Sequence, residues 1–126
     1  MKLLIDSSAW LEYLSDSPKA KGLERYFKPP HKVVLPSIVA YEVYKRIKAE
    51  RGERSAVIVL AQMERISTSL LSIDQGLAVK AADVSIEHKL PMADAFIYAT
   101  ALSTGSTVLT LDAHFKGLKQ VQFIAS

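Results

Sequence analysis

Four acidic residues lie where their side chains could share a metal ion. Asp6 and Asp112 each follow a short apolar run, Glu42 lies within a segment of helical periodicity, and Asp94 opens another such segment. Carboxylates gathered at one site raise one another's pKa values unless a cation lies among them. Ligation by oxygen alone favours a hard divalent ion. The four residues therefore predict a Mg²⁺ or Mn²⁺ site.

Each of these residues also has a simpler local explanation. Asp6 could cap the helix that follows it, Asp94 could complement the dipole of a first helical turn, and Asp112 could form an Asx-turn. Glu42 is harder to explain locally, because it borders the apolar stripe of its helix, where a carboxylate is costly unless it is paired. One shared site explains all four positions together.

The elements that must position these side chains alternate between strand and helix. Apolar runs predict four to five short strands, and helical periodicity predicts helices between them, which is typical of a mostly parallel, Rossmann-like α/β sheet with helices on both faces. We expect Ser7 or Ser8 to cap the first helix, and a helical hairpin arm around residues 37–67. The expected strands are 3–5, 33–35, 69–73, 107–110 and 121–124, and the other helices are 7–14, 18–27, 75–86 and 93–103.

The length and composition indicate a single domain over residues 1–126. The sequence has no cysteine, which excludes disulfides, thiolate-bound zinc and a cysteine nucleophile. No apolar run is long enough for a membrane span, and the first residues do not form a signal peptide, so we expect a cytoplasmic protein without membrane contact. In an open α/β sheet, ligands bind outside the carboxyl ends of the strands, which is where Asp6 and Asp112 are expected.

The formal net charge of +3 hides an uneven distribution. When the four acidic residues are set aside, nine of the 13 acidic residues remain against 16 Lys and Arg. An acidic site within a basic surface suits a metal-dependent enzyme that acts on a polyanion. Lys45 and Arg46 could contact RNA or a protein partner, although such a cluster can equally form the solvated face of a helix.

Four short motifs carry the acidic residues along the chain: Asp6-Ser7-Ser8, Glu42 after Pro36-Ser37, Asp94-Ala95 and Thr110-Leu111-Asp112. Taken in order, these motifs resemble the PIN-domain nucleases and, within them, the small toxin ribonucleases of VapBC toxin–antitoxin pairs. The resemblance covers essentially the whole chain. Many relatives carry a further acidic residue shortly after the last Asp, whereas this chain has Ala113, His114 and Phe115 there.

The resemblance implies a Mg²⁺- or Mn²⁺-dependent endoribonuclease with one or two ions per site. It implies a structured RNA substrate such as tRNA or ribosomal RNA, and products with 5′-phosphate and 3′-hydroxyl ends. It also implies a VapB-type antitoxin and a homodimer, for which Tyr41 and Tyr44 are possible contacts. Ser8 and Thr110 match polar positions of the family and could hydrogen-bond the carboxylates or a metal-bound water, although local capping explains them as well.

Two other classes of function are open at this point. A phosphoacceptor α/β domain also has an Asp after its first strand, although its usual second Asp and strand-end Lys are missing here. A PIN-like module that binds RNA without cutting it is the other alternative. The three histidines have no histidine or base-activating partner in the sequence, so surface roles are expected for them. His114 is the exception to watch, because it follows Asp112 by two residues.

Overall fold

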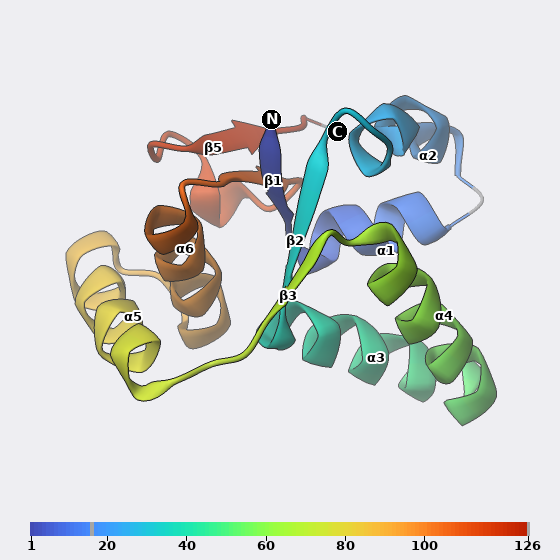
Figure 1. Ribbon diagram of the computed structural model, residues 1–126, viewed down its shortest axis with the longest axis horizontal. Helices are drawn as coiled ribbons and strands as arrows, with labels where there is room; N and C mark the ends of the chain where they lie inside the picture. Colours follow the sequence, from blue (N-terminus) through green and yellow to red (C-terminus); the bar gives the residue numbers. More distant parts are fainter. Residues whose placement is uncertain (16, 126) are drawn as a thin grey trace.

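The computed structural model describes residues 1–15 and 17–125, and it shows a five-stranded sheet with helices on both sides (Figure 1). Every pair of neighbouring strands is parallel, so the predicted α/β fold is confirmed. Two strands end earlier than predicted, at Leu71 and Phe123. In their spatial order the strands are β3 (Ser69–Leu71), β2 (Lys32–Pro36), β1 (Lys2–Ile5), β4 (Thr107–Thr110) and β5 (Val121–Phe123).

The order in which strands are added to the sheet reverses between β1 and β4, although the two strands run parallel. The chain builds β1, β2 and β3 towards one edge, and then returns to add β4 on the other side of β1. Right-handed crossovers put the helices of the two halves on opposite faces, as Figure 1 shows. Such a reversal leaves a crevice at the carboxyl ends of the two strands, where α/β proteins bind ligands. One face carries α1 (Ser7–Leu14), α2 (Pro18–Leu23), α3 (Ser37–Arg51) and α4 (Glu53–Ile66), and the other carries α5 (Gln75–His88) and α6 (Met92–Thr104).

Helices α3 and α4 form the predicted hairpin arm. They are joined at Gly52, whose φ of +90° lies in a region that residues with a side chain rarely adopt. Val39, Val43 and Ile47 recur at helical spacing on α3 and are buried in the core. This packing fixes the orientation of α3, and with it the direction of the polar residues on the neighbouring face of the helix.

The predicted helix over residues 18–27 is shorter than expected. The α-helix ends at Leu23, and the chain continues as the 3₁₀ helix η1 (Glu24–Phe27), a frequent way for a short helix to end. Phe27 is buried there and packs against two aromatic rings of α1, Trp10 and Tyr13. Among the described residues, no helix has both the length and the apolar character needed to cross a membrane.

Candidate active site

Asp6 lies directly after β1 and is only 2% exposed. Its Oδ1 accepts hydrogen bonds from the Ser8 hydroxyl at 2.6 Å and from the Ala9 backbone N–H at 3.2 Å, and its Oδ2 accepts one from the Thr110 hydroxyl at 2.6 Å. Asp6, and not Ser7 or Ser8, is therefore the N-cap of α1, which corrects the prediction. The cap uses only Oδ1, since a carboxylate has two acceptor oxygens and one is enough to accept the helical N–H. Oδ2 remains available for other partners.

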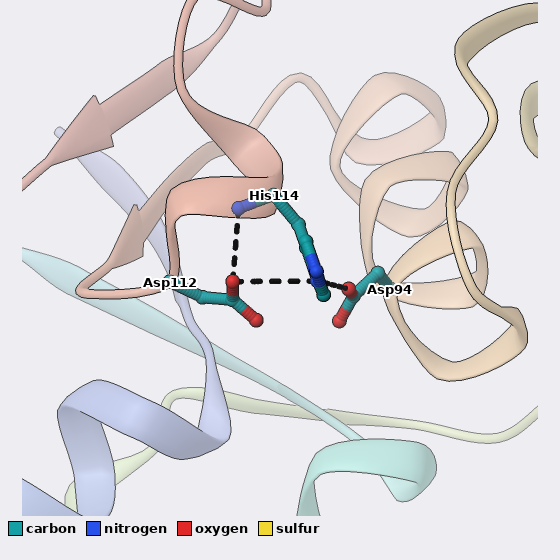
Figure 2. A group of neighbouring side chains, drawn as sticks. All are labelled: Asp94, Asp112 and His114. Atoms are coloured by element: carbon teal, nitrogen blue, oxygen red, sulfur yellow. Dashed lines mark hydrogen bonds and ion pairs between the residues drawn. The ribbon is translucent and has the colours of Figure 1, made fainter.

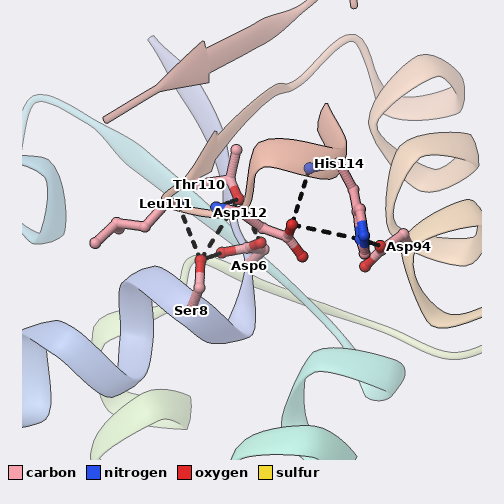
Figure 3. Close-up of polar contacts among 7 residues, drawn as sticks. All are labelled: Asp6, Ser8, Asp94, Thr110, Leu111, Asp112 and His114. Carbon is pink, nitrogen blue, oxygen red and sulfur yellow. Dashed lines mark hydrogen bonds and ion pairs between the residues drawn. The ribbon is translucent and has the colours of Figure 1, made fainter. Parts of the chain in front are cut away.

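Ser8 and Thr110 connect Asp6 to the segment that follows β4. While their hydroxyls donate to Asp6, their oxygens accept hydrogen bonds from consecutive backbone N–H groups, those of Leu111 at 3.0 Å and Asp112 at 2.9 Å (Figure 3). Thr110 is fully buried. The network joins the carboxyl ends of β1 and β4, where the strand order reverses, and it places Asp112 beside Asp6.

Asp94, Asp112 and His114 come together from two elements. Asp94 lies in the first turn of α6, and Asp112 begins the 3₁₀ helix η2 (Ala113–Phe115), where its Oδ1 accepts a hydrogen bond from the His114 backbone N–H at 2.9 Å. The His114 Nδ1 lies 2.8 Å from Asp94 Oδ2 and 3.4 Å from Asp112 Oδ1 (Figure 2). One ligand atom from each residue lies within 4.8 Å of the others, a spacing that can hold a metal ion.

His114 is the residue of this cluster whose role the sequence did not predict. Its side chain is 60% exposed, as expected for a surface histidine, but its ring is turned towards the two carboxylates. The sequence feature that could have indicated this role is its position two residues after Asp112, in the same turn. The other two histidines lie elsewhere: His88 ends α5 and packs edge-on against Tyr98, and His31 precedes β2 beside Tyr26.

Glu42 lies on α3 and is half-buried. Its Oε1 is buried and has no hydrogen-bond partner among the described residues. Burial raises the pKa of Glu42, the Ser7 hydroxyl opposes this, and the carboxylates of Asp94, Asp6 and Asp112 raise it further. Glu42 therefore lies within electrostatic reach of the other three acidic residues, and it keeps one oxygen free for a cation.

A family model described as PIN domain matches residues 3–121 of the sequence. The chain belongs to the PIN-domain family. The match runs from β1 to the first residue of β5, and it includes the four acidic residues together with Ser8, Thr110 and His114. No curated protein matches the sequence.

Several solved structures have the fold of this PIN domain. A toxin–antitoxin complex from Klebsiella pneumoniae is 23% identical, with a TM-score of 0.76 over 97% of this chain and 96% of that one. The Mycobacterium tuberculosis toxin VapC20, described as cleaving the sarcin–ricin loop, is 21% identical, with a TM-score of 0.76 and the same coverage. VapBC2 from Rickettsia felis, bound to a promoter DNA fragment, is 13% identical, with a TM-score of 0.78 over 99% of this chain and 100% of that one.

The electrostatics of the PIN-domain site suit a divalent cation. Burial raises the pKa of Asp6 despite the hydrogen bonds that it accepts, and the nearby Asp112 raises it further. Burial also raises the pKa of Asp94, with opposition from His114 and a further increase from Asp112. Three carboxyl groups that are costly to ionise, and a buried oxygen without a partner, are the donor set that a hard cation stabilises. The residues present therefore fit a Mg²⁺ or Mn²⁺ ion.

A groove with basic residues on its wall runs beside Glu42. Lys45 and Arg46 are exposed on α3, and both line this groove. Arg46 forms an ion pair with Glu50 at 2.5 Å, and Lys45 donates to the Tyr41 hydroxyl at 3.3 Å. The remaining lining residues are Ser7, Leu11, Tyr41, Glu42 and Ala49.

Removing the charge of Glu42 should stabilise the metal-free protein. At pH 7 in EDTA, we expect Glu42→Gln to raise the Tm by about 2–4 °C, because a half-buried carboxylate with one oxygen lacking a partner among the described residues is replaced by a neutral amide. Because the pKa of Glu42 is raised in the folded state, the wild type loses stability as the pH rises through that pKa. The difference in Tm between Glu42→Gln and the wild type should therefore shrink as the pH falls below about 4, where Glu42 is protonated in both the folded and the unfolded protein. Thermal denaturation at pH 7 and pH 4 measures it.

The exposed residue Glu64 on α4 supplies the control for this measurement. Glu64→Gln should leave the Tm unchanged at both pH values. Saturating Mn²⁺ should stabilise the wild type more than Glu42→Gln. A Glu42→Gln protein that is less stable than the wild type in EDTA would show that the carboxylate has a structural role.

Proposed function

We propose that this PIN domain is a Mg²⁺- or Mn²⁺-dependent endoribonuclease and the toxin of a VapBC-type toxin–antitoxin pair. The observation that carries the proposal is the cluster of Asp94, Asp112 and His114, in which one ligand atom of each residue lies within 4.8 Å of the others. The buried Asp6 lies beside Asp112, and Glu42, with one oxygen that has no partner among the described residues, lies within electrostatic reach of these carboxylates. Family membership and the likeness to toxin–antitoxin complexes support this function over a phosphoacceptor domain. The intact set of acidic residues supports a nuclease over a module that only binds RNA.

In the proposed reaction, Asp6, Glu42, Asp94 and Asp112 hold the ion or ions and orient the phosphodiester group. When bound, a divalent ion lowers the pKa of a water molecule and stabilises negative charge on the phosphodiester oxygens. The oxygen of a water molecule forms a new bond to phosphorus while the bond between phosphorus and the 3′ oxygen breaks. The 3′ oxygen takes up a proton, so that one fragment ends in a 3′-hydroxyl and the other in a 5′-phosphate. Through their hydrogen bonds to Asp6, Ser8 and Thr110 keep both strand ends in place.

The charge of the four carboxylates bears on the number of ions. Together they carry −4, so one divalent ion leaves −2 at the site and two leave it neutral. An anionic RNA substrate is repelled by a site that remains negative. This favours the arrival of a second ion together with the RNA.

We infer that the substrate is a structured RNA, such as tRNA or ribosomal RNA. The basic groove beside Glu42 supports this inference, because Lys45 and Arg46 can contact phosphates next to the acidic site. VapC20, which has the same fold, is described as cleaving the sarcin–ricin loop. That loop is a reasonable first substrate to test.

We also infer two protein partners. A VapB-type antitoxin would inhibit by placing an Arg or Lys side chain among Asp6, Asp94 and Asp112, where it would take the position of the metal charge. A second copy of the chain would form a homodimer. Tyr41, which is 57% exposed, is available for such contacts, whereas Tyr44 is partly buried against the core.

Metal dependence of RNA cleavage tests the proposed function. We expect the purified protein to cleave a sarcin–ricin loop RNA or total tRNA in Mg²⁺ or Mn²⁺, to stop in excess EDTA, and to resume when the ion is restored. Labelling of the product ends should detect 5′-phosphate and 3′-hydroxyl groups. Cleavage that persists in excess EDTA would contradict the proposal.

A further inference from the structure

His114 adds a nitrogen atom to a site that is otherwise made of carboxylates. Its Nδ1, and not its Nε2, is the ring atom directed at Asp94 and Asp112, at 2.8 Å and 3.4 Å from their oxygens (Figure 2). The backbone N–H of the same residue donates to Asp112 Oδ1, which anchors the residue on the turn that carries Asp112. This hydrogen bond fixes the main chain of His114 next to Asp112, from where its ring reaches both carboxylates.

The distances match those between neighbouring ligands of one ion. An ion with ligands at about 2.1 Å in octahedral geometry places adjacent ligand atoms about 3 Å apart. The two distances from Nδ1 to the carboxylate oxygens lie close to that value, one slightly shorter and one slightly longer. Because the His114 side chain is 60% exposed, the ring can adjust its position without disturbing the core.

We propose that His114 Nδ1 is a ligand of the divalent ion held by Asp94 and Asp112, and that this nitrogen makes the site prefer Mn²⁺ to Mg²⁺. The inference rests on the proposed metal-dependent function. Mg²⁺ is bound almost entirely by oxygen, whereas imidazole binds first-row transition-metal ions well. A site with one nitrogen and several carboxylate oxygens still binds Mg²⁺, but the nitrogen contributes less to the affinity for Mg²⁺ than to the affinity for Mn²⁺.

Electron spin-echo spectroscopy of the Mn²⁺ complex tests this proposal without measuring activity. An imidazole nitrogen bound to Mn²⁺ gives ¹⁴N modulation. We expect this signal in the wild type and in His88→Gln, which changes a histidine outside the cluster, and its loss in His114→Gln. The affinity for Mn²⁺ should fall about tenfold in His114→Gln, while that for Mg²⁺ should change less than about twofold.

The outcomes separate the failure of this inference from the failure of the proposed function. Wild-type protein that binds Mn²⁺ without ¹⁴N modulation, or modulation that persists in His114→Gln, would overturn the role of His114 and leave the metal site in place. Wild-type protein that binds no Mn²⁺ would overturn both. Circular dichroism should show that His114→Gln is folded, as expected for a side chain that is mostly exposed.

Discussion

Asp94→Asn should reduce RNA cleavage more than about a hundred-fold, because it removes a carboxylate that would bind the ion directly, and loss of residues that only support metal ligands already costs about 10- to 100-fold. Asp94 is the most informative of the four positions. Its side chain is 14% exposed and, among the described residues, hydrogen-bonds only with His114, so the change to Asn should leave the fold intact. Initial rates in Mg²⁺ and Mn²⁺ measure the effect.

The other carboxylates should behave in the same way, with Asp6→Asn, Glu42→Gln and Asp112→Asn each losing cleavage. Asp83 supplies the control, because it is an exposed acidic residue of α5 outside the site. Asp83→Asn should keep the wild-type rate. Full activity in any one of the four variants would remove that residue from the set of ligands.

Thr110→Val is expected to lower both stability and activity. The Thr110 hydroxyl donates to Asp6 Oδ2 and accepts from the Asp112 backbone N–H, so the change leaves a carboxylate oxygen and a backbone donor without partners. Because Thr110 is fully buried, we expect a loss of roughly 2 kcal/mol in the free energy of unfolding. The rate of cleavage should fall by about 10- to 100-fold, because Thr110 no longer fixes the positions of Asp6 and Asp112 relative to each other.

Thr110→Ser is the matched variant, because it keeps the hydroxyl and removes only a methyl group. It should recover most of the activity that Thr110→Val loses. Chemical denaturation and initial cleavage rates should be measured on the same preparations. If Thr110→Val is destabilised but cleaves at the wild-type rate, the network is structural and does not position the carboxylates.

The sequence predicts the strands and the hairpin arm because their periodicities are strong and local. Apolar runs identify β1 and β4, and the helical spacing of Val39, Val43 and Ile47 identifies the buried face of α3. Helix and strand ends are less predictable, as the 3₁₀ continuation after Leu23 shows. Whether a helix tightens in its last turn depends on contacts with distant residues, which a local pattern does not contain.

The sequence indicates the candidate site residues but not their contacts. For Asp6, the helix-cap explanation is correct, and it is compatible with the proposed site, because one oxygen caps α1 while the other accepts from Thr110. The Asx-turn at Asp112 is likewise real. The role of His114 could not be predicted, since it depends on which way the ring turns and on where α6 places Asp94.

Calorimetric titration with Mn²⁺ tests the central claim, that the four acidic residues of this PIN domain bind a divalent ion, most directly. We expect saturable binding of one or two ions to the wild type and to Asp83→Asn, and its loss or severe weakening in Asp94→Asn and Glu42→Gln. Equal affinity and stoichiometry in the wild type and in Asp94→Asn would show that the ion is not bound by these residues, and a wild-type protein that binds no Mn²⁺ would show that the site is not a metal site.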